Sequence, residues 1–159
     1  MRLWFGLALC LLPLLAQAAT VDLVLVEKNR HRLSLYAGDK LVSSYQVAPG
    51  KTPIGAKTCE GDDKTPEGEY RITDRIENSA FHRALHLSYP NAADTARARS
   101  LGCQPGGRIM IHGLRNGLGW LGALHRQRDW TAGCIALTNA EIEQVWQQVA
   151  DGTRVVIRP

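Results

Sequence analysis

The sequence predicts a mainly β fold with one clear C-terminal α-helix. Segments with strand patterns alternate with turn signals along almost the whole chain, and one segment combines helical spacing with a capping sequence. The 159 residues are 45% hydrophobic and include 15 glycines and 7 prolines. This composition supplies the core of one globular domain and excludes disordered, collagen-like and coiled-coil chains.

The N-terminal segment predicts a secretory signal peptide. Arg2 precedes an apolar run over residues 3–15, which is short for a membrane span, and Ala-Gln-Ala at residues 16–18 is a small-residue cleavage site. The alternative, a buried N-terminal helix, does not explain that cleavage site. We expect residues 1–18 to be removed, leaving a periplasmic domain over residues 19–159 without stable membrane insertion.

Strand patterns begin directly after this segment. Residues 21–27 form a continuous apolar run, residues 32–36 alternate, and the turn between them predicts a hairpin. Residues 41–47 predict a third strand. The segment over residues 49–68 is rich in Pro, Gly, Lys, Thr and Asp, and it predicts a solvated loop.

Downstream, three further strands and a short helix are predicted. Asn91 is placed to cap a short helix before Leu101. The strand patterns lie at residues 70–73, 84–89 and 108–112.

The clear helix follows Thr138. Thr138 and Glu141 form a capping box, and Gly152 is expected to end the helix. A last strand is predicted at residues 155–157. The apolar residues of the helix repeat at helical spacing: Ile142, Val145, Trp146 and Val149.

The charge of the chain does not favour nucleic acid as a partner. The formal charge of +4 falls to +3 when Arg2 leaves with the signal peptide. The only dense basic patch, residues 97–99 with Arg126 and Arg128, lacks interleaved aromatic residues. An anionic substrate or polymer remains compatible with this composition.

The cysteine count points to one free thiol. Cys59, Cys103 and Cys134 remain after signal cleavage, and an odd number in an oxidising compartment leaves one unpaired. A zinc site built from these cysteines with His82 and His86 is an alternative, but only the two histidines are closely spaced, and residues around them alternate like a strand. We therefore expect no metal and no cofactor.

Two residues carry the chemistry that a cysteine enzyme needs. His112 and Cys134 each lie at the end of a strand pattern beside a glycine. An imidazole near a thiol lowers the thiol pKa from about 8.5 and supplies thiolate near neutrality. The alternative is a structural histidine and a buried, inert cysteine.

Four motifs together resemble the YkuD-type L,D-transpeptidase catalytic domain, the cysteine enzymes of bacterial peptidoglycan. They are G-D-x-x-T-P-E-G-x-Y at residues 61–70, Y-P-N-A-x-D at 89–94, G-G-x-I-x-I-H-G at 106–113 and T-x-G-C-I at 131–135. The resemblance covers nearly the whole mature chain and is strongest for the small periplasmic branch of the family. It implies a β-sandwich-like fold with the active site in a groove between the sheets.

The resemblance implies a role for each site residue. Cys134 is the nucleophile, His112 is the general base and later the acid, and Thr131 and Gly133 shape the loop that presents the Cys134 N–H as an oxyanion donor. Cys59 and Cys103 then remain as the disulfide candidate. The expected substrate-binding residues are Gly113, Arg115, Trp120, His125, Arg128, Trp130 and Tyr89.

The loop over residues 113–130 is expected to be a mobile lid over the nucleophile. It has four glycines for hinges and apolar residues that would be unusual in an idle solvent loop. His125 is either a lid residue that touches substrate or a plain loop residue.

Two positions depart from the common form of the family motif. Ala132 and Ala136 stand where many members have histidine and arginine, so Arg115 or Arg128 is expected to supply the missing cationic contact. The expected function is L,D-transpeptidation of peptidoglycan stem peptides through a Cys134 thioester, in cell wall biogenesis or remodelling. The alternatives are an L,D-carboxypeptidase or amidase that hydrolyses a stem-peptide or lipoprotein linkage, and a non-catalytic wall-binding module.

Overall fold

The computed structural model describes residues 20–159, so the predicted signal peptide lies outside the described residues. No helix in the described part of the chain has the length and apolar character needed to cross a bilayer. The elements in chain order are β1 (Leu23–Glu27), η1 (Lys28–Arg30), β2 (Arg32–Ala37), β3 (Lys40–Gln46), β4 (Gly68–Ser79), β5 (His82–Leu87), α1 (Ala92–Ser100), β6 (Met110–His112), η2 (Gly119–Gln127), β7 (Ile135–Ala136), α2 (Asn139–Gln148) and β8 (Arg154–Arg158).

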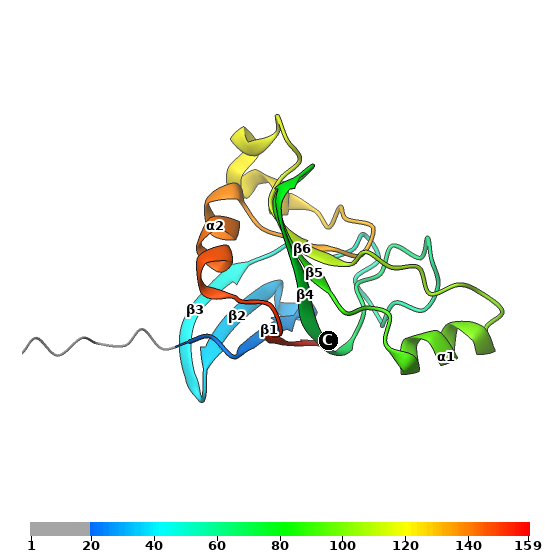
Figure 1. Ribbon diagram of the computed structural model, residues 1–159. Coiled ribbons are helices and arrows are strands. Elements are labelled where there is room, and N and C mark those ends of the chain that lie inside the picture. Colours follow the sequence, from blue (N-terminus) through cyan, green and yellow to red (C-terminus); the bar gives the residue numbers. More distant parts are fainter. Residues whose placement is uncertain (1–19) are drawn as a thin grey trace, which may run out of the picture.

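The strands form one mixed sheet of eight, in the order β3-β2-β1-β8-β4-β5-β6-β7. The N-terminal strands β1 to β3 pair antiparallel, and the C-terminal strand β8 joins them by pairing parallel to β1. The first half of β4 pairs with β8 and its second half pairs with β5, with register shifts that bend the ladder. The predicted mainly β class is confirmed, and the two expected layers are the two halves of one continuous sheet that meet on β4 (Figure 1).

The strand β4 is much longer than the sequence predicted. The prediction stopped at residue 73, whereas β4 continues to Ser79. Residues 74–79 are mostly polar and exposed or half-buried, so they lack the apolar alternation on which a strand prediction depends. This second half is held by pairing with β5 instead of by core burial.

The predicted C-terminal helix is present as α2. Thr138 and Glu141 form the expected reciprocal capping box, and α2 packs against β5. Its inward residues Ile142 and Val145 are fully buried, so the helix joins the hydrophobic core of the sheet (Figure 1). The expectation that Gly152 ends the helix is wrong: α2 ends at Gln148, because the next residue turns to extended backbone and enters the core.

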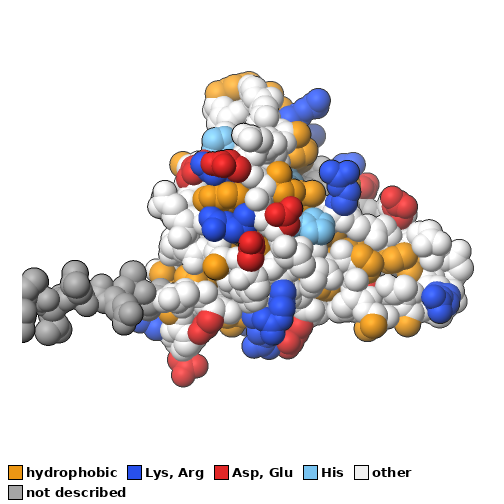
Figure 2. All heavy atoms as spheres, in the orientation of Figure 1, with side chains coloured by type: hydrophobic (Ala, Val, Ile, Leu, Met, Phe, Trp, Pro, Cys, Tyr) orange, Lys and Arg blue, Asp and Glu red, His pale blue; other side chains and the backbone are white. Residues whose placement is uncertain are grey.

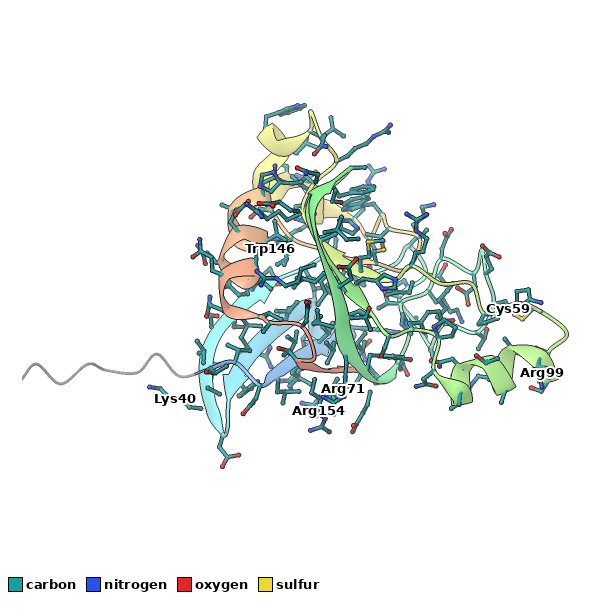
Figure 3. The ribbon with its side chains drawn as sticks, viewed as in Figure 1. Lys40, Cys59, Arg71, Arg99, Trp146 and Arg154 are labelled. Atoms are coloured by element: carbon teal, nitrogen blue, oxygen red, sulfur yellow. A yellow bond between two sulfur atoms is a disulfide. The ribbon has the colours of Figure 1, made fainter. Side chains whose placement is uncertain are left out.

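The short helix expected after Asn91 is also present, as α1. Asn91 and Asp94 cap it reciprocally, and the buried Asp94 carboxylate accepts a hydrogen bond of 3.0 Å from the Tyr70 hydroxyl of β4. Beyond α1, Cys103 forms a disulfide with Cys59, with 5.7 Å between the two Cα atoms (Figure 3). The disulfide therefore ties the long loop after β3 to the segment that leads into β6.

Candidate active site

Parallel pairing of β6 and β7 brings the predicted catalytic residues to one place. His112 pairs with Ala136, and Cys134 lies two residues before Ala136 along the chain. Cys134 directly precedes β7, so this pairing sets it near the end of β6. His112 and Cys134 accordingly line one cleft of about 590 Å³, together with Met110.

The opposite wall of this cleft comes from the turn between β4 and β5, which the sequence did not suggest as functional. Asn78 to Phe81 carry no pattern of a catalytic motif, and their proximity to Cys134 depends on the sheet order. The cleft residues that sequence reasoning missed are Lys51, Ile76, Asn78, Ser79, Ala80, Phe81, Arg108, Met110 and Ala132.

The turn before Cys134 is closed by one hydroxyl. The buried Thr131 Oγ1 donates to the carbonyl of Cys134 at 2.7 Å and accepts from the Gly133 N–H at 3.1 Å. Gly133 has a φ of +127°, and a Cβ there would lie 2.6 Å from the carbonyl oxygen of Lys64. Only glycine fits this position, and since the Gly133 N–H is already used, the Cys134 N–H is the candidate oxyanion donor.

The segment over residues 49–68, predicted as a solvated loop, instead supports the loop that carries Cys134. The Lys51 N–H donates to the Thr131 carbonyl at 2.9 Å, and the Gly50 N–H donates to the Thr65 hydroxyl at 2.9 Å. Thr65 is fully buried, as its place in this hydrogen-bonded layer requires. Thr65 of the Thr-Pro-x-Gly motif therefore bonds the backbone of Gly50, and the next residue, Lys51, bonds the backbone of the loop that carries Cys134.

His112 is held in the form that can accept a proton. Its Nδ1–H donates to the Gly113 carbonyl at 2.6 Å, because a carbonyl can only accept, so in the neutral ring Nε2 carries the lone pair. Burial lowers the pKa of His112, although the Gly113 hydrogen bond opposes the shift. Phe81 and Trp130 flank the ring, with centroids 4.5 and 5.9 Å away.

Cys134 is a free, partly exposed cysteine whose thiol is not preactivated. Burial raises the pKa of this thiol, and its Sγ–H donates to the Arg108 carbonyl at 3.7 Å. The expectation of a thiolate near neutrality is therefore wrong for the protein without substrate, because desolvation outweighs the neighbouring groups. The site pairs a neutral thiol with a neutral imidazole.

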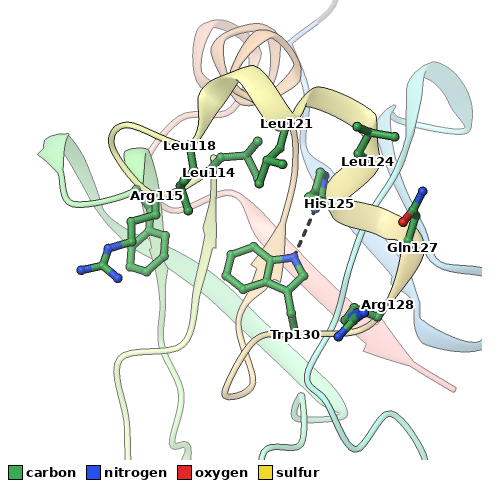
Figure 4. Close-up of a pocket in the computed structure, with 10 residues that line it drawn as sticks. Leu114, Arg115, Leu118, Leu121, Leu124, His125, Gln127, Arg128 and Trp130 are labelled. Atoms are coloured by element: carbon green, nitrogen blue, oxygen red, sulfur yellow. Dashed lines mark hydrogen bonds between the residues drawn. The ribbon is translucent and has the colours of Figure 1, made fainter.

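Arg115, His125 and Arg128 do not line the Cys134 cleft. They lie around a second pocket of about 460 Å³, which is mostly apolar and is lined also by leucines of residues 113–130 (Figure 4). Phe81 and Trp130 belong to both cavities and so form the wall between them. The Trp130 Nε1–H donates to His125 Nδ1 at 3.3 Å, which fixes this wall from behind.

The other expected substrate-binding residues lie further from the nucleophile. Trp120 is 75% exposed at the tip formed by η2, where Figure 2 shows hydrophobic side chains at the top of the molecule. The buried Tyr89 donates to the Pro105 carbonyl at 2.8 Å, and Gly113 packs against α2 and Phe81. Of the expected substrate-binding residues, Trp130 is the one that lines the Cys134 cleft.

The residues of the alternative zinc site are engaged elsewhere. Cys59 and Cys103 are bonded to each other, His82 pairs with Glu143 at 2.8 Å, and His86 bonds Thr73 at 2.8 Å. Within residues 20–159, no three His, Cys, Asp or Glu side chains are grouped so that they could hold a metal ion.

Comparison with known proteins gives a consistent result. The family model YkuD, the L,D-transpeptidase catalytic domain, matches residues 21–157. The Bacillus subtilis protein named "Putative L,D-transpeptidase YqjB" is 32% identical over 142 residues, covering 84% of this chain and 69% of that protein. "Putative L,D-transpeptidase YafK" of Escherichia coli K12 is 30% identical over 129 residues, covering 77% of this chain and 44% of that protein.

Solved structures share the fold. The helical cell shape determining protein Pgp2 from Campylobacter jejuni superimposes with a TM-score of 0.66 at 28% identity, over 87% of this chain and 47% of Pgp2. An L,D-transpeptidase from Mycobacterium smegmatis, at 11% identity, has a TM-score of 0.58 over 87% of this chain and 59% of that chain, and so shows the fold alone. The chain thus spans less than half the length of YafK and of Pgp2.

Proposed function

The chain belongs to the L,D-transpeptidase catalytic domain family, which acts on peptidoglycan, and from this premise we propose that it is a periplasmic cysteine enzyme that transfers the acyl group of a stem peptide through a Cys134 thioester. The observation that carries the proposal is the pair of His112 and Cys134 in one cleft, with the His112 Nδ1–H held by a carbonyl. A merely structural histidine would not need to share a cleft with a free cysteine. The same pairing argues against a wall-binding module without activity.

The chemistry follows from the protonation states. His112 Nε2 takes the proton of the Cys134 thiol as sulfur attacks the carbonyl at the L-centre of the diamino acid. The Cys134 N–H stabilises the resulting oxyanion. Collapse breaks the peptide bond, His112 returns its proton to the leaving amine, and the acyl group remains on sulfur as a thioester.

The group that attacks the thioester in the second half of the reaction decides which product forms. An amine that loses its proton to His112 attacks the thioester and gives a new amide, which is transpeptidation. Water in the same place gives a carboxylate, which is the L,D-carboxypeptidase or amidase outcome, with a lipoprotein linkage as one substrate of that type. We propose transpeptidation as the main reaction, in cell wall biogenesis or remodelling, and the cell-shape name of Pgp2 agrees with such a role.

Two features support export to the periplasm. The N-terminal 18 residues have the pattern of a cleaved signal, and the disulfide between Cys59 and Cys103 is typical of an oxidising compartment. A cytoplasmic location of the protein in cell fractionation would contradict this part of the proposal.

The test uses purified protein and defined muropeptides. Intact-mass spectrometry should show an acyl adduct on the wild type and none on Cys134→Ala, while His112→Gln should form it at least 100-fold more slowly. Product analysis with and without an amine acceptor separates transfer from hydrolysis. Activity that survives Cys134→Ala, or that a chelator abolishes, would overturn the proposal.

A further inference from the structure

The Cys134 cleft has two cationic side chains on its wall and no acidic one. Lys51 and Arg108 line it, and the other lining residues are neutral or apolar apart from His112. A cleft lined by charges of one sign attracts ligands of the opposite sign. The two cations are far apart in the sequence: Lys51 lies in the loop after β3, and Arg108 lies in the segment that leads into β6. The disulfide between Cys59 and Cys103 joins these two segments.

Arg108 has an unusual backbone that keeps it at the nucleophile. Its φ is +54°, a left-handed conformation that non-glycine residues rarely adopt, and its carbonyl accepts the Cys134 thiol hydrogen. Such strain concentrates at functional sites. The ion pairs formed within residues 20–159 do not include Arg108, whose side chain is exposed.

The backbone of Lys51 is held in place, and its side chain forms one exposed ion pair. Its N–H bonds the Thr131 carbonyl, so the residue stays beside the turn that presents Cys134. Its ammonium lies 3.4 Å from Asp63, but Lys51 is 56% exposed, and pairs of this kind contribute little. The Lys51 side chain can therefore exchange Asp63 for a ligand at small cost.

We propose that Lys51 and Arg108 form a carboxylate subsite, which selects stem peptides with a free carboxylate within one residue of the scissile carbonyl. This inference rests on the proposed function. One residue of extended chain spans about 3.5 Å, so a carboxylate there reaches the wall of the same cleft. Ala136, which stands where many family members have arginine, is fully buried and supplies no cation. Arg115 and Arg128, the expected replacements, line the second pocket instead.

The subsite explains how this chain works with alanine two residues after its nucleophile. A guanidinium and an ammonium near the scissile bond bind this carboxylate by charge-assisted hydrogen bonds, which are stronger than bonds between neutral groups. They also hold the scissile carbonyl against Cys134 and bring no extra acid or base to the reaction. Lys51 and Arg108 are thus specificity-determining residues that contact the substrate.

The test compares peptides that differ only in one carboxylate. A tetrapeptide with a free C-terminus, its C-terminal amide, and the analogue amidated on the diamino acid side chain are assayed with the wild type, Lys51→Met and Arg108→Met. We expect each variant to lose about 10- to 100-fold in kcat/KM on the free acid. On the peptide that lacks the recognised carboxylate, the loss should nearly vanish, and this arm identifies which of the two carboxylates is bound.

Lys40→Met on β3 and Arg99→Met on α1 are the matched controls, because both residues are exposed and distant from the cleft (Figure 3). They should retain the wild-type ratio between acid and amide. Arg108→Lys should recover part of the loss, which a purely structural role of Arg108 would not predict. Binding of the acid to Cys134→Ser, followed by calorimetry, reports on the subsite without turnover.

Failure of this inference can be told from failure of the proposed function. The wild type could form the thioester equally well from the acid and both amides, or both Met variants could keep the wild-type ratio of kcat/KM between acid and amide. Either result would contradict the carboxylate subsite and leave the proposed enzyme function intact. If no peptide forms a thioester on the wild type, the proposed function itself fails.

Discussion

The Thr131 hydroxyl donates to the carbonyl oxygen of Cys134 across 2.7 Å, so one buried side chain sets the conformation of the Cys134 peptide unit. The Thr131 hydroxyl oxygen in turn accepts a hydrogen bond from the Gly133 N–H. These two bonds hold the turn that carries Cys134, and neither of them uses the Cys134 N–H.

Thr131→Val should therefore slow the enzyme. Valine keeps the shape but leaves a buried N–H and carbonyl unpaired, at a cost of about 1–3 kcal/mol in stability. We expect thioester formation to fall at least tenfold, whereas Thr131→Ser keeps both bonds and most of the rate. Stopped-flow acylation followed by mass spectrometry measures this. Equal rates for the Val and Ser variants would show that the hydroxyl does not position the nucleophile.

Gly133→Ala should destabilise the fold more than a glycine substitution elsewhere. The new Cβ meets the Lys64 carbonyl at 2.6 Å, in a backbone with φ of +127°. We expect a loss of about 1–3 kcal/mol beyond that of Gly38→Ala, whose φ of +57° is also left-handed but whose Cβ site has no neighbour within 4 Å. Urea denaturation measures both, and equal losses would contradict the close contact.

The reactivity of Cys134 should rise only at alkaline pH. Because burial raises the pKa of the thiol, iodoacetamide alkylation should show a midpoint above the ordinary value of about 8.5. His112→Gln should leave that midpoint nearly unchanged, since the imidazole is neutral. A plateau of reactivity below pH 7 that disappears in His112→Gln would show a preformed ion pair instead.

The protein should lose stability as pH falls from about 6.5 to about 4. Burial, assisted by the Arg126 guanidinium, lowers the pKa of His125 to about 4, so over this range the unfolded chain binds a proton that the folded chain excludes. Protonation of His125 lowers the free energy of unfolding by up to about 3 kcal/mol. The lowered pKa of His112 decreases stability over the same fall in pH.

Denaturation at pH 7.5 and 4.5 checks this. The difference in the free energy of unfolding between the two pH values should shrink in His125→Gln. It should remain unchanged in the control His86→Gln, because His86 lies on β5 and bonds Thr73. Equal pH dependence in wild type and His125→Gln would contradict a buried neutral His125.

The elements that sequence patterns identified are those whose side chains enter the core. The hairpin of β1 and β2, strand β8 and helix α2 all have apolar periodicity or reciprocal caps, and these local signals were sufficient. The second half of β4 was missed because its polar residues are held by pairing with β5. The support of Cys134 by residues 49–68 was missed because backbone hydrogen bonds leave no side-chain pattern.

The sequence by itself determined the mainly β class, the pair of Cys134 and His112 as the candidate chemistry, and the remaining cysteines as candidates for a disulfide. These depend on residue type and short spacing, which a linear chain displays. Only the tertiary structure decided that Lys51 and Arg108 line the same cleft as Cys134, while Arg115 and Arg128 line another pocket. The physical reason is the sheet order, which sets residues of β4, β6 and the segment before β7 around one cleft, where burial shifts the pKa values of His112 and Cys134.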